Sequence, residues 1–205
     1  MLTKIFLIRH GETEWNRVGK LQGSSDIRLS PEGLHQAQLL AEHTPFHAVD
    51  AVYSSDLVRA VMTAKILADK FNLPIIKERG LRETSFGDWE GRSLKELAKE
   101  NPNGFENFFM RPDKVQPPNG ETFLQSQARI MNALDEIIAD NENKNIIIVT
   151  HGAAIRLILC AALYIPIRKM WAVNQNNMAL NILTVDEGNF SLELMNSTLH
   201  LYNFC

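Results

Sequence analysis

The sequence predicts an α/β fold, a single three-layer α/β/α domain built around a mostly parallel sheet. Three short runs are apolar and β-branched on both faces, as is typical of buried strands: KIFLI (4–8), AVDAVYSS (48–55) and NIIIVT (145–150). Segments with helical periodicity lie between them. Strands that alternate with helices in this way favour a largely parallel sheet with helices on both faces.

Two helices are predicted between the first strands. The segment 30–43 opens with Ser30 as an N-cap and Pro31 at the first helical position, a strong signal for a helix start. The segment 55–71 carries an apolar stripe at helical spacing, and either Ser55 or Asp56 is expected to cap it.

The second half of the chain adds a helix, a hairpin and an insertion. Residues 120–140 form another amphipathic pattern, and two alternating runs around Glu187-Gly188-Asn189 predict a β-hairpin. Residues 84 to about 120 are rich in glycine and proline, with a short helix expected at 93–100. We interpret this segment as a small helical insertion, placed like a lid over one end of the sheet within a domain that spans 1–205.

Composition excludes several classes of protein. The chain has 205 residues, 45% of them apolar, and a formal net charge of −3, so it lacks the basic balance of a nucleic-acid-binding protein. Its longest apolar region, 153–167, contains Arg156 and is shorter than the ~20 residues of a membrane span. No signal peptide is apparent, and the two cysteines, Cys160 and Cys205, cannot form a disulfide framework. We therefore expect a cytoplasmic protein, and the sequence leaves open whether it is a monomer or a homodimer.

One pattern occurs twice. FLIRHG and IIVTHG each join an apolar strand to a polar residue, a histidine and a glycine, which places His10 and His151 at strand ends. Ligands of open α/β sheets bind beyond the carboxyl ends of the strands. Gly11 and Gly152 would let the backbone approach such a ligand closely. A lone strand-end histidine is usually structural, but two in matched contexts indicate a site.

Three further residues are expected at the same edge. Arg59 lies in the first turns of a predicted helix, where side chains lean toward the helix N-terminus, and Glu83 lies where the chain leaves the sheet for the insertion. Guanidinium groups such as those of Arg9 and Arg59 match phosphate oxygens, while an imidazole near cations is biased toward its neutral, nucleophilic form. A carboxylic acid can protonate a departing alkoxide. The set predicts phosphoryl transfer without a metal or cofactor.

The motifs LIRHGETEWN, YSSDLVRAVMTA, LRETSFGDWEG, PPNGET and VTHGAAIR resemble those of the histidine phosphatase superfamily, in the family's order and over nearly the whole chain. Two of its groups, the α-ribazole phosphatases and the metal-independent phosphoserine phosphatases, are the most similar in FGDWEG and LMNSTLHL. The resemblance implies that His10 is phosphorylated and that Glu83 is first a proton donor and then a base. It further implies that the phosphoryl group or the ligand is held by Arg9, Arg59, His151, Asn16, Thr13, Gln22 and Gly152, with His200 near the site.

Alternatives remain open within this resemblance. The favoured function is a phosphatase acting on a small phosphorylated metabolite: α-ribazole 5′-phosphate, phosphoserine or a broad range of phosphomonoesters. A phosphoglycerate mutase is the first alternative, although its family members have longer insertions with adjacent arginines, whereas the cations here are scattered: Arg92, Lys95, Lys99, Arg111 and Lys114. A non-catalytic phosphate-binding module is the second. Trp171 is interpreted as a packing residue rather than a ligand platform. The FENFFM segment (105–110) could form the floor of a hydrophobic substrate pocket, but its helical spacing is at least as well explained by packing of the insertion onto the body.

Overall fold

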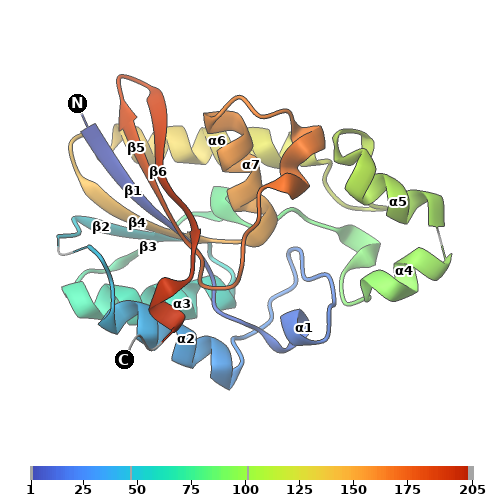
Figure 1. Cartoon of the computed structure of the whole chain (residues 1–205), viewed down its shortest axis with the longest axis horizontal. Helices are drawn as coiled ribbons and strands as arrows, with labels where there is room; N and C mark the ends of the chain where they lie inside the picture. Colours follow the sequence, from blue (N-terminus) through green and yellow to red (C-terminus); the bar gives the residue numbers. More distant parts are fainter. Residues whose placement is uncertain (1, 47, 101, 203–205) are drawn as a thin grey trace.

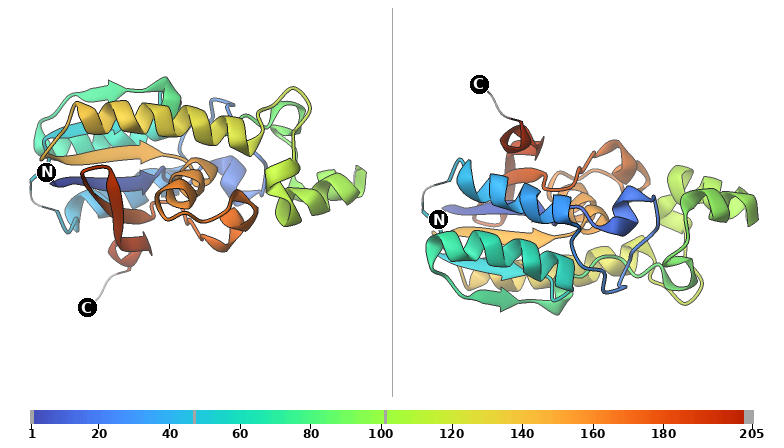
Figure 2. Two further views of the ribbon diagram at one scale, coloured as in Figure 1. Left: turned by 90° about the horizontal axis from the view of Figure 1, so that it is seen from above. Right: turned by 90° about the horizontal axis from the view of Figure 1, so that it is seen from below.

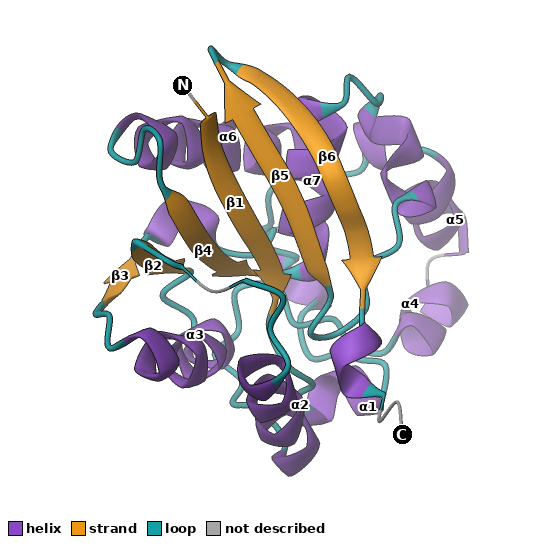
Figure 3. Cartoon of the chain, turned by 60° about the vertical axis from the view of Figure 1, so that its left-hand side comes forward, coloured by secondary structure: helices purple, strands orange, loops and turns teal. Residues whose placement is uncertain are grey.

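The computed structural model describes residues 2–46, 48–100 and 102–202 and contains a six-stranded sheet with the order β3-β2-β4-β1-β5-β6 (Figures 1 and 3). The pairs β1–β4, β2–β4 and β2–β3 are parallel, while β5 and β6 add an antiparallel edge. The mostly parallel α/β fold is thus confirmed. The strands are β1 (Leu2–Arg9), β2 (Ala51–Ser54), β3 (Ile75–Lys77), β4 (Asn145–Thr150), β5 (Leu180–Asp186) and β6 (Asn189–Ser197).

Helices cover both faces of the sheet, which gives three layers (Figure 1). The alternation along β1 decides which side chains meet which helices: Ile5 and Leu7 belong to one buried core, and Phe6 and Ile8 to the other. Burying one such side chain contributes about 1.5–3 kcal/mol, so both faces stabilise the sheet. The first core includes α6 (Phe123–Ala139) and α7 (Gly152–Ala162), and the second α2 (Pro31–Glu42) and α3 (Val58–Phe71).

The register of the two central strands positions the site. Ile8 pairs with Val149 and Arg9 with Thr150, and the His10 N–H donates to the Thr150 carbonyl oxygen (3.0 Å). The chain therefore leaves both strands at the same level of the sheet. Residues 10 and 151 become neighbours as a direct result.

The segment between β3 and α6 (residues 78–122), here called the excursion, lies beyond the carboxyl ends of the parallel strands, as Figure 2 shows. It contains α4 (Leu94–Glu100) and α5 (Pro102–Met110), together with the 3-10 turns η1 (Arg79–Leu81), η2 (Gly87–Trp89) and η3 (Pro112–Lys114). Aromatic contacts attach α5 to the body: the Phe108 ring centroid is 5.7 Å from that of Phe123 on α6 and 5.0 Å from that of Trp171. Residue 101 of the predicted insertion lies outside the described residues, as does Cys205.

The C-terminal part of the chain follows the prediction in its main feature. The hairpin is confirmed, and Glu187 and Gly188 turn between β5 and β6 with φ of 47° and 80°. Two more 3-10 segments, η4 (Ile167–Ala172) and η5 (Leu199–Leu201), flank it. Among the described helices, none combines the length and the apolar composition needed to cross a membrane.

The start of α3 differs from the prediction. Its N-cap is Leu57, whose side chain makes no capping bond, rather than Ser55 or Asp56. Instead the Val58 N–H donates to the Asp26 carboxylate (2.6 Å), because the loop 23–26 lies against this helix end. The short helix α1 (Glu14–Arg17) and the three-residue strand β3 were also not predicted, since each is too short for a periodic signal.

The main chain of the loop after β1 is in direct contact with the main chain of the first turn of α2. The Ser30 N–H donates to the Glu12 carbonyl oxygen (2.9 Å). A β-carbon on Gly33 would lie 2.0 Å from that same oxygen, and one on Gly11 would lie 2.4 Å from the Gly33 oxygen. This contact has no space for a methyl group, so two glycines are required where the loop that follows His10 is anchored.

Gly33→Ala should therefore displace the loop that follows His10. We expect a loss of about 1–3 kcal/mol of unfolding free energy, as is common for an overpacked site, measured by urea denaturation. Gln38→Ala, on an exposed position of the same helix, is the matched control. Equal stability of Gly33→Ala and wild type would show that the loop and α2 are not held this tightly.

Candidate active site

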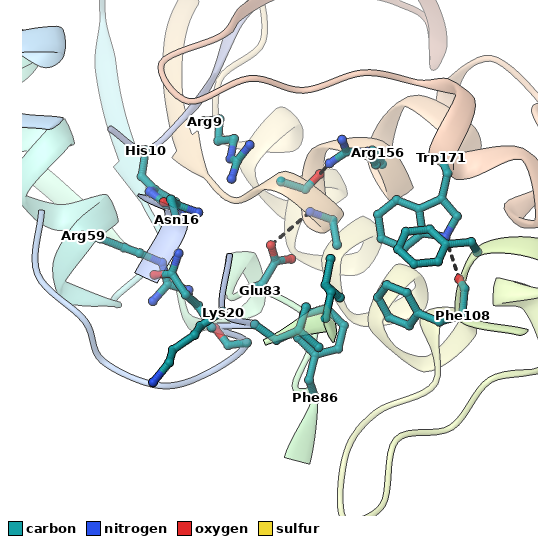
Figure 4. Close-up of a pocket in the computed structure, with 17 residues that line it drawn as sticks. Arg9, His10, Asn16, Lys20, Arg59, Glu83, Phe86, Phe108, Arg156 and Trp171 are labelled. Atoms are coloured by element: carbon teal, nitrogen blue, oxygen red, sulfur yellow. Dashed lines mark hydrogen bonds between the residues drawn. The ribbon is translucent and has the colours of Figure 1, made fainter. Parts of the chain in front are cut away.

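A pocket of about 180 Å³ lies at the carboxyl edge of the sheet, against the excursion (Figure 4). Its lining combines charged and polar side chains with apolar and aromatic ones. The pocket is lined by Arg9, His10, Asn16, Lys20, Leu21, Gln22, Gly23, Arg59, Glu83, Phe86, Leu94, Phe108, Phe109, Gly152, Ala153, Arg156 and Trp171.

His10 is held as a neutral base. Its Nδ1 lies 2.7 Å from the Gly11 carbonyl oxygen, which can only accept, so Nδ1 carries the proton. Nε2 therefore carries the lone pair, and no partner for it exists within the described residues. Burial lowers the pKa of His10 well below its usual value, and the cations Arg59 and Arg9 lower it further. A buried, deprotonated Nε2 at a pocket has a lone pair available for attack on an electrophile.

Arg59 is a cation with no exposed surface at all. Its guanidinium donates to the carbonyl oxygens of Ser25 and Gly23 (2.7 Å each) and, through Nε, to His151 Nδ1 (3.2 Å). Burial lowers the pKa of Arg59 to about 10, which still leaves it protonated at neutral pH. The loop 23–25 and His151 thus aim a permanent positive charge at the pocket.

His151 lies beside His10, with ring centroids 5.2 Å apart. Its Nδ1 accepts from Arg59, so the ring is neutral with the proton on Nε2, which bonds Ser55 Oγ (2.8 Å). Burial lowers the pKa of His151 well below its usual value. Because both ring nitrogens are engaged, contact between His151 and a phosphoryl group requires Nε2–H to leave Ser55. Ser55 thus orients His151 rather than capping α3.

Asn16 presents its amide donors to the pocket. Its Oδ1 accepts from the backbone N–H and the hydroxyl of Thr13 (3.1 and 3.0 Å) and from Asn177 Nδ2 (3.2 Å). With the oxygen fully used, the Nδ2 group is left for a ligand acceptor such as a phosphate oxygen. Thr13 itself is buried and does not line the pocket, so its place in the site is to hold Asn16 through the capping box of α1.

Arg9 leaves one edge of its guanidinium unused. Nη1 donates to the Gln175 carbonyl oxygen (2.6 Å), whereas Nε is buried without a partner. Burial, together with repulsion from Arg156, lowers the pKa of Arg9 to about 10. Arg9 lines the pocket beside His10 and is suited to bind a phosphate oxygen pair.

The carboxyl group of Glu83 is fixed at the N-terminus of α7. Its oxygens accept from the backbone N–H groups of Ala153, Ala154 and Thr84, each at 3.0 Å (Figure 4 shows the group facing the pocket). Glu83 is therefore rigid, and it lies on the pocket wall across from His10. Gln22 and Gly152 also line the pocket, as expected from the sequence.

His200 lies elsewhere. It is buried in η5, where it bonds the backbone of Met178 and lies near His43, and it is not among the residues that line the pocket. Burial lowers its pKa to about 4. The tail does fold back onto the body, but toward α2 rather than over the pocket. We therefore no longer assign His200 to ligand binding.

Sequence reasoning missed several pocket residues, above all Arg156, Lys20 and Trp171. Arg156 follows Gly152 by four residues on α7, and positions four apart share a helix face, so this spacing was the available signal. Trp171 does pack, as predicted, and donates from Nε1 to the Phe108 carbonyl oxygen (2.7 Å), but it also forms a wall of the pocket.

The fold and the site together define an α/β protein with a cationic pocket suited to phosphoryl transfer. The profile of the histidine phosphatase superfamily (branch 1) matches residues 5–198, and the chain belongs to this family. It is 33% identical to the metal-independent phosphoserine phosphatase of Arabidopsis thaliana over 204 residues, 98% of this chain and 84% of that one.

Solved structures give the same result. Bacillus stearothermophilus YhfR is similar at a TM-score of 0.93 with 31% identity, covering 98% of this chain and all of that one. The α-ribazole phosphatase from Shigella flexneri is similar at a TM-score of 0.85 with 28% identity, covering 95% and 96% of the two chains. Both groups named from the sequence motifs are thus found among the similar proteins.

The placement of His200 gives a testable pH dependence. A histidine whose pKa is lower in the folded state takes up a proton on unfolding. Its contribution to stability is thus complete above about pH 6.5 and is lost as the pH falls toward 4. In His200→Asn the urea midpoint should fall less steeply between pH 6.5 and 4.5 than in wild type. The KM for a phosphomonoester should be unchanged, and a raised KM with an unaltered acid slope would return His200 to the ligand site.

Proposed function

We propose that this protein is a metal-independent phosphatase that hydrolyses a small phosphomonoester through a phosphohistidine at His10. The observation that carries the proposal is the state of His10: Nδ1 is protonated by the Gly11 contact and Nε2 is free, with Arg9 and Arg59 beside it. Both arginines stay charged at neutral pH, so the negative charge of a bound phosphoryl group is neutralised by residues that need no metal.

In the first step, Nε2 of His10 attacks phosphorus while the ester P–O bond breaks. The departing alkoxide takes its proton from the Glu83 carboxyl group, which the three backbone donors hold at the pocket wall. Arg9, Arg59 and the Asn16 amide donate to the equatorial oxygens. These donors are already in place before the reaction, so they stabilise the negative charge that develops on the oxygens in the transition state. Such stabilisation is usually the largest single contribution to the rate acceleration.

In the second step, Glu83, now a carboxylate, takes a proton from a water molecule that attacks phosphorus from the vacated side. The N–P bond breaks, inorganic phosphate forms, and His10 recovers its Nε2 lone pair. The two steps use the same acid–base group in opposite directions.

Hydrolysis is supported over the mutase alternative by the position of the cations on the excursion. Arg92, Lys95, Lys99, Arg111 and Lys114 all lie outside the set of residues that line the pocket. The excursion instead contributes apolar side chains, and we propose that it acts as a lid over the substrate. The names of the similar proteins support α-ribazole 5′-phosphate or phosphoserine as the substrate, and a broad range of phosphomonoesters is the third candidate. The free, buried thiol of Cys160 suits the cytoplasm, which we propose as the location.

Trapping the intermediate tests the nucleophile. Rapid quench with a ³²P-labelled phosphomonoester should place an acid-labile, base-stable label on the peptide that contains His10. His10→Ala should remove both label and turnover, and excess EDTA should change neither in wild type. Label on another residue would refute the assignment. Rapid interconversion of 2- and 3-phosphoglycerate that outpaces phosphate release would favour the mutase.

The role of Glu83 can be separated from that of His10 by the choice of leaving group. Glu83→Gln should slow alkyl phosphates by about 10²–10⁴-fold, the usual contribution of a general acid. The loss for p-nitrophenyl phosphate should be much smaller in the phosphorylation step, because its leaving group needs little protonation. Comparison of single-turnover burst rates measures this step alone. Equal losses for both substrates would exclude Glu83 as the acid.

A further inference from the structure

The pocket holds more positive charge than a phosphoryl group can neutralise. Arg9, Arg59, Arg156 and Lys20 line it, and Glu83 is the sole carboxylate among the lining residues. Within the described chain, none of these three arginines forms a salt bridge with a carboxylate, unlike Arg82 or Arg129. A phosphomonoester brings a charge of about −1.5 to −2 at neutral pH. A substrate with one more negative charge would balance the pocket better.

Arg156 is one of two pocket cations, the other being Lys20, that the proposed mechanism does not use. Its Nη1 donates to the Gly152 carbonyl oxygen (3.0 Å), and its guanidinium carbon lies 5.4 Å from the Trp171 ring centroid. Its Nε is buried without a partner. The aromatic contact and the Nη1 bond fix the orientation of the group, so Arg156 is preorganised although its Nε–Nη2 edge is unoccupied.

The same edge binds carboxylates elsewhere in this chain. Arg82 uses Nε and Nη2 to hold both oxygens of Asp56 (2.6 and 2.7 Å), and Arg129 holds Glu121 in the same way (2.9 and 2.8 Å). A planar guanidinium edge matches the two oxygens of a carboxylate. In the pocket, Arg9 and Arg156 both lack a partner at Nε.

The guanidinium groups of Arg9 and Arg156 are adjacent. A β-carbon on Gly152 would lie 3.2 Å from Arg9 Nε and 3.2 Å from Arg156 Nη1, so the two guanidinium groups flank one point at the start of α7. Figure 4 shows Arg156 next to Arg9 on the side toward Trp171. An anion at Arg156 would therefore be separated from a phosphoryl group at Arg9 by the length of a short carbon chain.

We infer that Arg156 forms a second anion site that binds a substrate carboxylate, and that the preferred substrates are phosphomonoesters with a carboxylate two or three carbons from the ester oxygen. The inference rests on the proposed phosphatase function and narrows its substrate class. A single guanidinium edge against an indole ring suits a planar carboxylate, whereas a second phosphate would need several converging donors. On this basis an α-ribazole phosphate, which has no carboxylate, is disfavoured.

A matched pair of substrates tests the inference. Phosphoserine and phosphoethanolamine differ only in the carboxylate. Wild type should prefer phosphoserine by about 10–100-fold in kcat/KM, the range that loss of a charged hydrogen-bond pair implies. Arg156→Met should remove that preference by lowering the phosphoserine value. Arg156→Lys, which keeps the charge but loses the planar edge, should restore part of it. Arg168→Met, an exposed arginine on η4, is the control and should keep the wild-type preference.

Two results would overturn the second anion site while leaving the phosphatase intact: turnover of both substrates by wild type with equal kcat/KM, or equal losses on both in Arg156→Met. A protein that turns over neither these nor p-nitrophenyl phosphate would refute the proposed function instead. In that event, calorimetric titration of His10→Ala with each of the two compounds still tests the carboxylate site. Phosphoserine should bind at least tenfold more tightly than phosphoethanolamine, and equal dissociation constants would exclude the site. Wild-type and His10→Ala data suffice if Arg156→Met fails to fold.

Discussion

The buried charge of Arg59 is the constraint on which the site depends. A guanidinium with no exposed surface must be surrounded by acceptors, and it obtains them from the loop carbonyls of Ser25 and Gly23 and from His151 Nδ1. These bonds account for the path of the loop 23–25 and for the tautomer of His151. The bond that this tautomer makes to Ser55 in turn leaves α3 to take its first cap contact from Asp26.

The same charge explains why the site favours a nucleophilic imidazole. Cations beside His10 and burial around it both disfavour the imidazolium form, and the Gly11 carbonyl oxygen decides which nitrogen keeps the proton. No carboxylate in the described chain forms a salt bridge with Arg9, Arg59 or Arg156, and the one carboxyl group in the pocket is held by backbone donors at the start of α7. The site is therefore an electropositive cavity that an anionic substrate completes.

The sequence analysis succeeded where local pattern and sheet topology carry the information. The paired runs that end in His10 and His151 could be placed together because both strands are apolar, parallel and adjacent, and the helix starting at Ser30 had a clear cap. The sequence analysis failed where a side chain bonds or contacts a residue that is distant in sequence. Ser55 has strong capping propensity, yet its hydroxyl bonds a histidine 96 positions away. His200 was misplaced because the direction in which a tail packs is set by tertiary contacts with α2, which no local pattern encodes.

The bond from Trp171 to the Phe108 carbonyl oxygen joins two segments that carry none of the proposed reacting groups. The proposed reacting groups lie at the sheet edge, on α1 and α3 and beside the start of α7, whereas Phe108 lies on α5 and Trp171 on η4. Because these two sets of residues lie on different elements, substitutions in α5 and η4 can change the shape of the pocket while the reacting groups stay in place. A change of substrate specificity by design would therefore require α5 and η4 to be redesigned together. A change that moved the Phe108 carbonyl oxygen alone would leave the Trp171 Nε1–H without a hydrogen-bond acceptor.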